Sequence, residues 1–268
     1  MRIPTHPDVE ERLGRLEIPF NSLGVDPYGV SKRYLGPWFT LLRFAFRTYF
    51  SVESHGIENV PAHGRVMLVG NHSGGVAIDG MMVIASQFFE MNPPRLAQGM
   101  IEKFMTAAPF ASLVSSRLGH LTGLPEHAER LLADDRMLMV FPEGARGTAK
   151  LFKDRYSLVN FGSGFVRLAM KTKTPIVPFA FLGGGDAVPT ISNAYSLGKL
   201  FGLPYVPLTP WLFAVPIPAK LEIYYSAPMH FDGDGSEEDE VVFGYVEQIK
   251  ERIGSLLDLG RRRRKGEA

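Results

Sequence analysis

The sequence predicts an α/β fold in which a largely parallel sheet is flanked by helices, preceded by an N-terminal amphipathic helical segment at a membrane interface. From residue 52 onward, short apolar runs alternate with longer amphipathic stretches, a pattern typical of parallel sheets covered by helices. The chain has 268 residues, of which 45% are hydrophobic and 21% charged. Such a chain is long enough for one large domain with a substantial core.

The N-terminal part differs in character from the rest. Residues 1–31 are rich in proline, glycine and polar residues and predict an irregular arm. Residues 34–50 read YLGPWFTLLRFAFRTYF and predict a helix that carries Arg43 and Arg47 on one face. The segment is too short and too charged to cross a bilayer, which takes about 20 apolar residues. Two interpretations stay open: an interfacial helix with its arginines at the headgroups, or a core helix.

The remaining elements follow from hydrophobic periodicity. Apolar runs predict strands at 65–70, 95–100, 137–141, 175–181 and 221–226. Amphipathic stretches predict helices at 79–89, 102–118, 125–134, 164–173 and 237–257. Many prolines and glycines predict an irregular insertion at 183–219.

These elements predict three parts of the chain. Residues 1–52 form the N-terminal arm and interfacial helix, residues 53–260 the α/β domain, and residues 261–268 a basic tail reading RRRRKGEA. The tail is either a solvated, disordered terminus or a contact with anionic lipid.

Composition excludes several kinds of site and partner. The chain has no cysteine, which excludes disulfides, thiolate metal ligands and a cysteine acyl-enzyme. A formal net charge of +1 gives no field that would attract nucleic acid. The seven histidines are scattered without ligand spacing, so we expect no metal site. The polar start lacks the apolar run of a signal peptide, and we expect a protein at the cytoplasmic face of a membrane.

Two predicted strands end in residues that can do chemistry. The strand 65–70 runs into NHSGGVAID, which contains His72 and Asp79, and the strand 137–141 runs into PEGARG, which contains Glu143 and Arg146. Open α/β sheets place their sites at the carboxyl ends of strands. We therefore expect both segments at one edge of the sheet.

A histidine followed by an aspartate suits general-base chemistry. Histidine can take a proton from a hydroxyl near neutral pH, and a carboxylate on the other ring nitrogen fixes the tautomer. The chain has no GxSxG motif, so direct attack by a substrate hydroxyl is simpler than an acyl-enzyme. The pair is also compatible with an ordinary histidine and an Asp79 that only caps the following helix.

The second segment adds positive charge. Arg146 offers a fork of donors for phosphate or carboxylate, and Lys150, Lys153 and Arg155 follow it. These three residues either hold phosphates of a substrate or form a solvated basic loop.

The combination of NHSGGVAID with FPEGAR further along the chain resembles the glycerolipid (lysophospholipid) acyltransferase superfamily, the PlsC-like group that includes bacterial lysophosphatidate acyltransferases. The proline-flanked strand TPIVP matches a third block of that family. GFVRLA, just before it, is similar to the diacylglycerol acyltransferase branch. The resemblance covers residues 53–230.

The resemblance implies an O-acyltransferase that moves a fatty acyl group from acyl-CoA or acyl carrier protein to a glycerolipid hydroxyl, with no permanently bound cofactor. The acceptor would be a lysophospholipid, a monoacylglycerol or a diacylglycerol. His72 would be the general base and Asp79 would orient it. Glu143, Gly144 and Arg146 would bind the acceptor.

The sequence departs from the family pattern at three places. Six residues separate the histidine from the aspartate, two more than usual, and Gly74 and Gly75 would have to let the loop bulge. The middle block, residues 118–123, lacks the arginine expected to grip an acceptor phosphate, although Arg117 lies just before it. Ala145 replaces the usual threonine. The missing cation favours a neutral acceptor.

Two other functions stay open. One is a lipid hydrolase in which His72 activates water. The other is a non-catalytic, lipid-binding protein that docks on membranes and retains the fold. The long histidine–aspartate spacing supports the docking protein, whereas the joint presence of Asn71, His72, Asp79, Glu143 and Arg146 argues against it.

Overall fold

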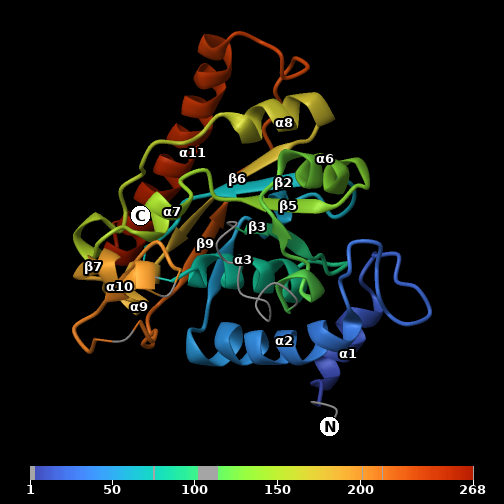
Figure 1. The fold of residues 1–268 in the computed structure, drawn as a ribbon, viewed down its shortest axis with the longest axis horizontal. Helices are drawn as coiled ribbons and strands as arrows, with labels where there is room; N and C mark the ends of the chain where they lie inside the picture. Colours follow the sequence, from blue (N-terminus) through green and yellow to red (C-terminus); the bar gives the residue numbers. More distant parts are fainter. Residues whose placement is uncertain (1–3, 75, 102–113, 201, 213, 268) are drawn as a thin grey trace.

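A seven-stranded sheet forms the centre of the molecule (Figure 1). The computed structural model describes residues 4–74, 76–101, 114–200, 202–212 and 214–267. The strand order is β1-β9-β6-β2-β5-β3-β4, and every neighbouring pair is parallel except β6 with β9. The strands are β1 (Glu53–His55), β2 (Val66–Gly70), β3 (Ala97–Ile101), β4 (Leu121–Thr122), β5 (Met137–Val140), β6 (Ile176–Leu182) and β9 (Glu222–Tyr225). The predicted α/β class with a largely parallel sheet is confirmed.

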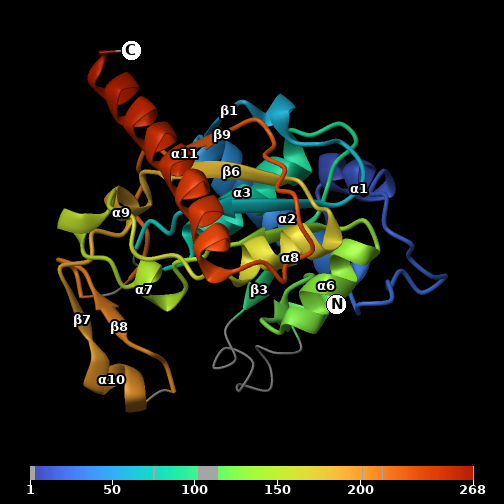
Figure 2. The same ribbon diagram turned by 90° about the horizontal axis from the view of Figure 1, so that it is seen from above.

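Helices cover both faces of the sheet (Figures 1 and 2). One face packs against α2 (Lys32–Phe44) and α3 (Ile78–Phe89), and the other against α6 (Pro125–Ala133), α8 (Gly164–Thr172) and α11 (Asp239–Lys265). Strand β2 is buried throughout and supplies both cores, because alternate side chains point to opposite faces. Val66 and Leu68 join the α2/α3 core, and Met67 and Val69 join the other.

The N-terminal part is more ordered than the sequence predicts. The expectation of an irregular arm over residues 1–31 is wrong, because α1 (Pro7–Gly14) lies within it. Val9 and Leu13 of this helix are buried, as the four-residue spacing of one helix face requires. The side chain of His6 accepts a hydrogen bond from the Asp8 amide and caps the first turn.

Helix α2 buries Leu35, Phe39 and Leu42 against the protein, whereas Leu41 and Phe44 on its other side are more than half exposed. Phe39 stacks on Phe88 of α3, with ring centroids 3.7 Å apart. Arg43 and Arg47, which we expected at lipid headgroups, form ion pairs with Asp8 of α1 at 3.0 and 3.1 Å. These contacts match the core-helix interpretation. A π-helical turn, η1 (Ala45–Tyr49), continues the helix.

The C-terminal half differs from prediction in two places. Helix α11 continues to Lys265, so the arginines of the predicted tail belong to its last turns. The expected irregular insertion contains α9 (Gly184–Ala187), β7 (Ser192–Ala194), α10 (Tyr195–Leu200) and β8 (Val206–Leu208), and β7 pairs with β8 in a separate antiparallel sheet.

Most of the predicted helix 102–118 lies outside the described residues. The remaining short elements are η2 (Ile57–Asn59), α7 (Ala145–Thr148) and η3 (Phe152–Asp154). Among the residues that the structure describes, no helix combines the length and apolar character needed to cross a bilayer.

Candidate active site

The two predicted site segments meet at one edge of the sheet. His72 follows β2 and Glu143 follows β5, and these strands are parallel neighbours that pair Val69 with Val140. Parallel strands bring their carboxyl ends to the same edge, where α3 also begins. The sheet topology therefore places both segments side by side.

His72 and Asp79 form a hydrogen-bonded pair. His72 Nδ1 lies 3.0 Å from Asp79 Oδ2. Asp79 is fully buried, and its carboxylate also accepts hydrogen bonds from the Ser73 amide, the Ser73 hydroxyl and the Gly80 amide. Burial by itself raises the pKa of Asp79, but the charge of His72 and these hydrogen bonds outweigh it, so that the pKa is lowered. The carboxylate is ionised at neutral pH and holds the proton of His72 on Nδ1.

The long loop between the two residues closes through a glycine. Gly74 has a φ of +91°, and a Cβ there would lie 2.8 Å from the Lys150 carbonyl oxygen. Only glycine accepts both conditions without strain. Asp79 is the second residue of α3, which Ala77 caps. Asp79 is therefore not the helix cap that the sequence left as an alternative.

The imidazole ring presents one free nitrogen. The ring stacks on Phe141, with centroids 4.0 Å apart and planes 11° from parallel. The side chain is 11% exposed. Within the described part of the chain, Nε2 makes no hydrogen bond. This nitrogen is therefore the one that a substrate hydroxyl can reach.

A buried ion pair fixes the main chain of His72. Glu143 accepts from the His72 amide at 2.9 Å and from the Val159 amide at 2.9 Å. Lys150 Nζ lies 2.6 Å from Glu143 Oε2 and donates to the His72 carbonyl at 2.8 Å. Burial lowers the pKa of Lys150, and the charge of Glu143 opposes that effect. We call these contacts the Glu143–Lys150 clamp.

The clamp gives Glu143 and Lys150 structural roles that differ from those expected from the sequence. Glu143 was expected to bind the acceptor, but both of its oxygens are occupied by protein donors. Lys150 was expected in a phosphate site or a solvated loop, yet its side chain is 2% exposed. Sequence reasoning missed this partnership because no local pattern marks a lysine in a glycine-rich turn as buried.

Arg146 is an accessible cation beside the candidate base. It lies on α7, whose N-cap is Gly144 with a φ of +56°. Its side chain is exposed and forms no ion pair or hydrogen bond with the residues described. Next to it, Gly147 packs against His72, because a Cβ there would lie 2.7 Å from the Cβ atoms of both His72 and Glu143. The short helix thus joins a free guanidinium to the candidate base.

Two of the other candidate cations are engaged elsewhere, whereas Lys153 is exposed and makes no ion pair with the residues described. Arg117 donates to the Gly29 carbonyl in the N-terminal region. Arg155 pairs with Asp186 at 2.9 Å and stacks over Phe152. Neither of these two side chains is positioned to replace the arginine that the middle family block lacks.

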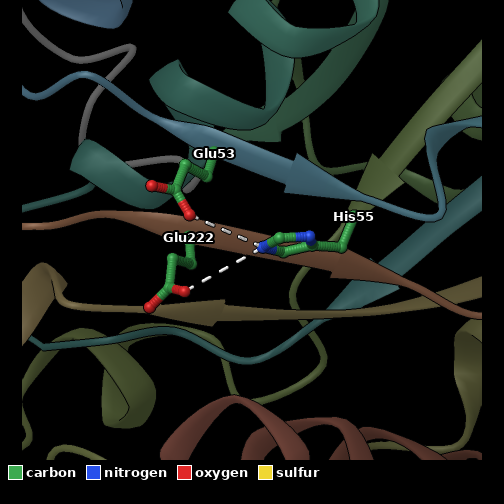
Figure 3. A group of neighbouring side chains, drawn as sticks. All are labelled: Glu53, His55 and Glu222. Carbon is green, nitrogen blue, oxygen red and sulfur yellow. Dashed lines mark ion pairs between the residues drawn. The ribbon is translucent and has the colours of Figure 1, made fainter. Parts of the chain in front are cut away.

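One cluster outside this site presents ligand atoms to a common centre. The imidazole of His55 faces the carboxylates of Glu53 and Glu222 (Figure 3), and their ligand atoms all lie within 4.8 Å of one another. Lys220 pairs with both carboxylates, and Arg264 pairs with Glu222. Two cations therefore neutralise the two carboxylates, and the cluster is an ion-pair network.

Comparison with known proteins supports an acyltransferase. Residues 51–182, which contain both site segments, match the acyltransferase family. The chain therefore carries an acyltransferase domain, which makes up about half of its length. Its fold is similar to that of the 1-acyl-sn-glycerophosphate acyltransferase PlsC from Thermotoga maritima, with a TM-score of 0.57, 16% identity, and coverage of 86% of this chain and 82% of that one.

Relatives with higher identity occur in mycobacteria. An uncharacterized protein of Mycobacterium tuberculosis strain H37Rv is 35% identical over 228 residues, which cover 81% of this acyltransferase chain and 63% of the relative. One from Mycobacterium leprae is 33% identical over 248 residues, which cover 88% of this chain and 66% of the relative. The chain thus spans about two thirds of the length of these relatives.

Proposed function

We propose that this acyltransferase transfers a fatty acyl group from an acyl thioester to a glycerolipid hydroxyl, with His72 as the general base. The observation that carries the proposal is the 3.0 Å contact between His72 Nδ1 and the buried, ionised Asp79. It leaves Nε2 as the basic nitrogen. The thioester would be carried by coenzyme A or acyl carrier protein. Because a water-soluble donor meets a lipid acceptor, the reaction belongs at the cytoplasmic face of a membrane.

The proposed reaction proceeds by addition and elimination. Nε2 takes the proton of the acceptor hydroxyl while its oxygen attacks the thioester carbonyl carbon. The carbonyl electron pair moves onto oxygen, and Asp79 stabilises the imidazolium. When the tetrahedral intermediate collapses, the C–S bond breaks and the imidazolium returns its proton to the thiolate. The products are an ester and a free thiol.

Arg146 and Gly144 are the proposed acceptor contacts. The free guanidinium of Arg146 can bind a phosphate or an ester carbonyl. Gly144 gives a substrate close access to the backbone at the N-cap of α7. Glu143 would act on the reaction only by holding the main chain of His72. The lack of an arginine in residues 118–123 favours a monoacylglycerol or diacylglycerol over lysophosphatidate.

Transfer assays with matched variants test the proposal. Purified protein is incubated with labelled acyl-CoA and a panel of lysophosphatidate, other lysophospholipids, monoacylglycerol and diacylglycerol. His72→Ala and Asp79→Asn should each reduce transfer by roughly 10²–10⁴-fold, the usual contribution of an acid–base group. His63→Ala is the control, because His63 is exposed and pairs with Glu17.

Two outcomes would contradict the proposal. Free fatty acid as the sole product would indicate a hydrolase in which His72 activates water. Absence of turnover with every acceptor and either thioester carrier, together with vesicle binding, would indicate a non-catalytic docking protein.

A further inference from the structure

The stretch between Asp186 and Glu222 has an unusual composition. Residues 187–221 contain no aspartate or glutamate, and their only charged residues are Lys199 and Lys220. We call this stretch the apolar protrusion. Among its described residues, eight larger apolar side chains are between 41% and 76% exposed: Ile191, Tyr195, Leu197, Leu200, Leu203, Leu212, Val215 and Ile217.

The protrusion stands out from the body of the protein. Figure 2 shows β7, β8 and α10 projecting away from the sheet and the helices that cover it. Within it, Gly198 packs against the main chain of Tyr205, since a Cβ at Gly198 would lie 2.5 Å from the Tyr205 Cα. The exposed apolar side chains are therefore carried by a folded support.

The base of the protrusion is attached beside the candidate active site. Asn193 donates to the Ala149 carbonyl at 2.7 Å, and the Phe152 amide donates to the Thr190 carbonyl at 2.8 Å. Ala149 directly precedes Lys150 of the Glu143–Lys150 clamp. Whatever the protrusion binds is therefore held on the side of the molecule that carries His72.

Exposed apolar residues of α2 and η1 lie next to the protrusion. The Tyr49 hydroxyl donates to the Pro216 carbonyl at 2.9 Å, which joins the end of η1 to the protrusion. Leu41 and Phe44, nearby on α2, are each more than half exposed. Water-exposed apolar patches of this kind mark interaction surfaces in folded proteins.

We propose that the apolar protrusion inserts the exposed apolar side chains named above into the surface of an anionic phospholipid bilayer. Lys199 is exposed and makes no ion pair with any residue described, so it is free to meet lipid phosphates, and no carboxylate in the protrusion repels them. The insertion itself does not depend on the proposed function. Only the role we give to it, bringing a lipid hydroxyl to His72, rests on that function.

Vesicle binding tests the insertion directly. The double variant Leu200→Gln/Leu212→Gln removes apolar contact at two positions that are 76% and 69% exposed, and its thermal unfolding should match the wild type. Its partition onto vesicles of equal parts phosphatidylcholine and phosphatidylglycerol should fall by at least about tenfold. The control is Leu23→Gln, which is 84% exposed in the N-terminal region and should bind like the wild type.

Tryptophan fluorescence provides a second test, which detects insertion directly and does not depend on a variant that binds vesicles less well. The chain has two tryptophans, Trp38 and Trp211, so Trp38→Phe leaves only the one on the protrusion. Brominated lipids should quench Trp211 in bound vesicles. Unchanged partition of the double variant, or absence of quenching, would overturn the proposal.

Two further arms separate related explanations. If the surface bound a second copy of the chain, the wild type would self-associate in sedimentation and the double variant would be monomeric. The two proteins would then bind vesicles equally, and that result would overturn the proposal. His72→Ala should bind vesicles normally, so a failed catalytic proposal leaves the docking result standing.

Discussion

Gly147 packs directly against the candidate base, His72. Replacement by alanine would press a Cβ against His72 and Glu143, each 2.7 Å away, and the candidate base would have to shift. Misplacement by about 1 Å can cost on the order of 10²-fold in rate. We expect Gly147→Ala to lower kcat by about 10- to 100-fold and stability by about 1 to 3 kcal/mol, measured by acyl transfer and urea unfolding.

The control for this substitution is Gly244→Ala. Gly244 lies inside α11, is exposed, and has no atom within 4 Å of the Cβ that would be added. Alanine there should stabilise the protein by about 0.5 to 1 kcal/mol and leave kcat unchanged. Normal activity in Gly147→Ala would show that His72 does not depend on this contact.

His120 makes stability depend on pH. Burial lowers the pKa of His120 from 6.5 to about 4, and a hydrogen bond to the Gly99 backbone acts in the opposite direction. The unfolded chain therefore gains a proton as the pH falls through 6.5, while the folded protein stays neutral until about 4. Stability should decrease over this window by about 1 to 3 kcal/mol. Unfolding at several pH values should show a flatter profile for His120→Gln; parallel profiles would refute the assignment.

At the scale of elements, the Glu143–Lys150 clamp joins the ends of β2 and β5. Lys150→Met would leave a carboxylate that is buried without its cation, and such changes typically cost about 3 to 5 kcal/mol. Adding Glu143→Gln removes the stranded charge and should restore part of the loss. Chemical unfolding of both variants measures this, and an equal or larger loss in the double variant would argue against the clamp.

Prediction from sequence succeeded for elements with long periodic patterns. Strands β2, β5 and β6 and helices α3, α6 and α8 begin and end within a residue or two of the predicted bounds. Strands β1 and β4 were missed because three and two residues carry no readable alternation. Helix α1 was missed because its proline-rich flanks suggested a loop, although Val9 and Leu13 have helical spacing.

The site was predictable only in part. The motifs singled out His72 and Asp79. Their contact, however, depends on the left-handed conformation of Gly74 and on the packing of Gly74 against the Lys150 main chain. No local sequence pattern encodes either feature. The acid-free stretch after Asp186 was visible in the sequence, but its exposure depends on how the chain folds back as β7 and β8.

At the scale of the whole molecule, the end of α11 ties strand β9 to helix α9. Arg264 forms ion pairs with Glu222 of β9 and with Asp186 of α9, and Arg263 lies over the ring of Tyr224. Among the described residues, Arg264→Met would leave Glu222, which is 2% exposed, with Lys220 as its remaining lysine or arginine partner. We expect a loss of about 2 to 4 kcal/mol in unfolding free energy.

Arg262, two residues before Arg264, is the matched control. It lies on the same helix turn, and its side chain forms no ion pair with the described residues, so Arg262→Met should change stability by less than about 0.5 kcal/mol. Equal melting temperatures for the two variants would show that the end of α11 is not a structural tie.

Asn71 has a consequence for how the site is held. Its side chain accepts from the Phe181 amide and donates to the Phe181 carbonyl, so it imitates one more rung of the ladder between β2 and β6. The rigid hydrogen-bonded centre of the sheet therefore extends to Asn71, the residue directly before His72. The Phe181 amide should retain its hydrogen in deuterated water as long as the core strands do. The base would then be preorganised, so that substrate binding would not have to order it.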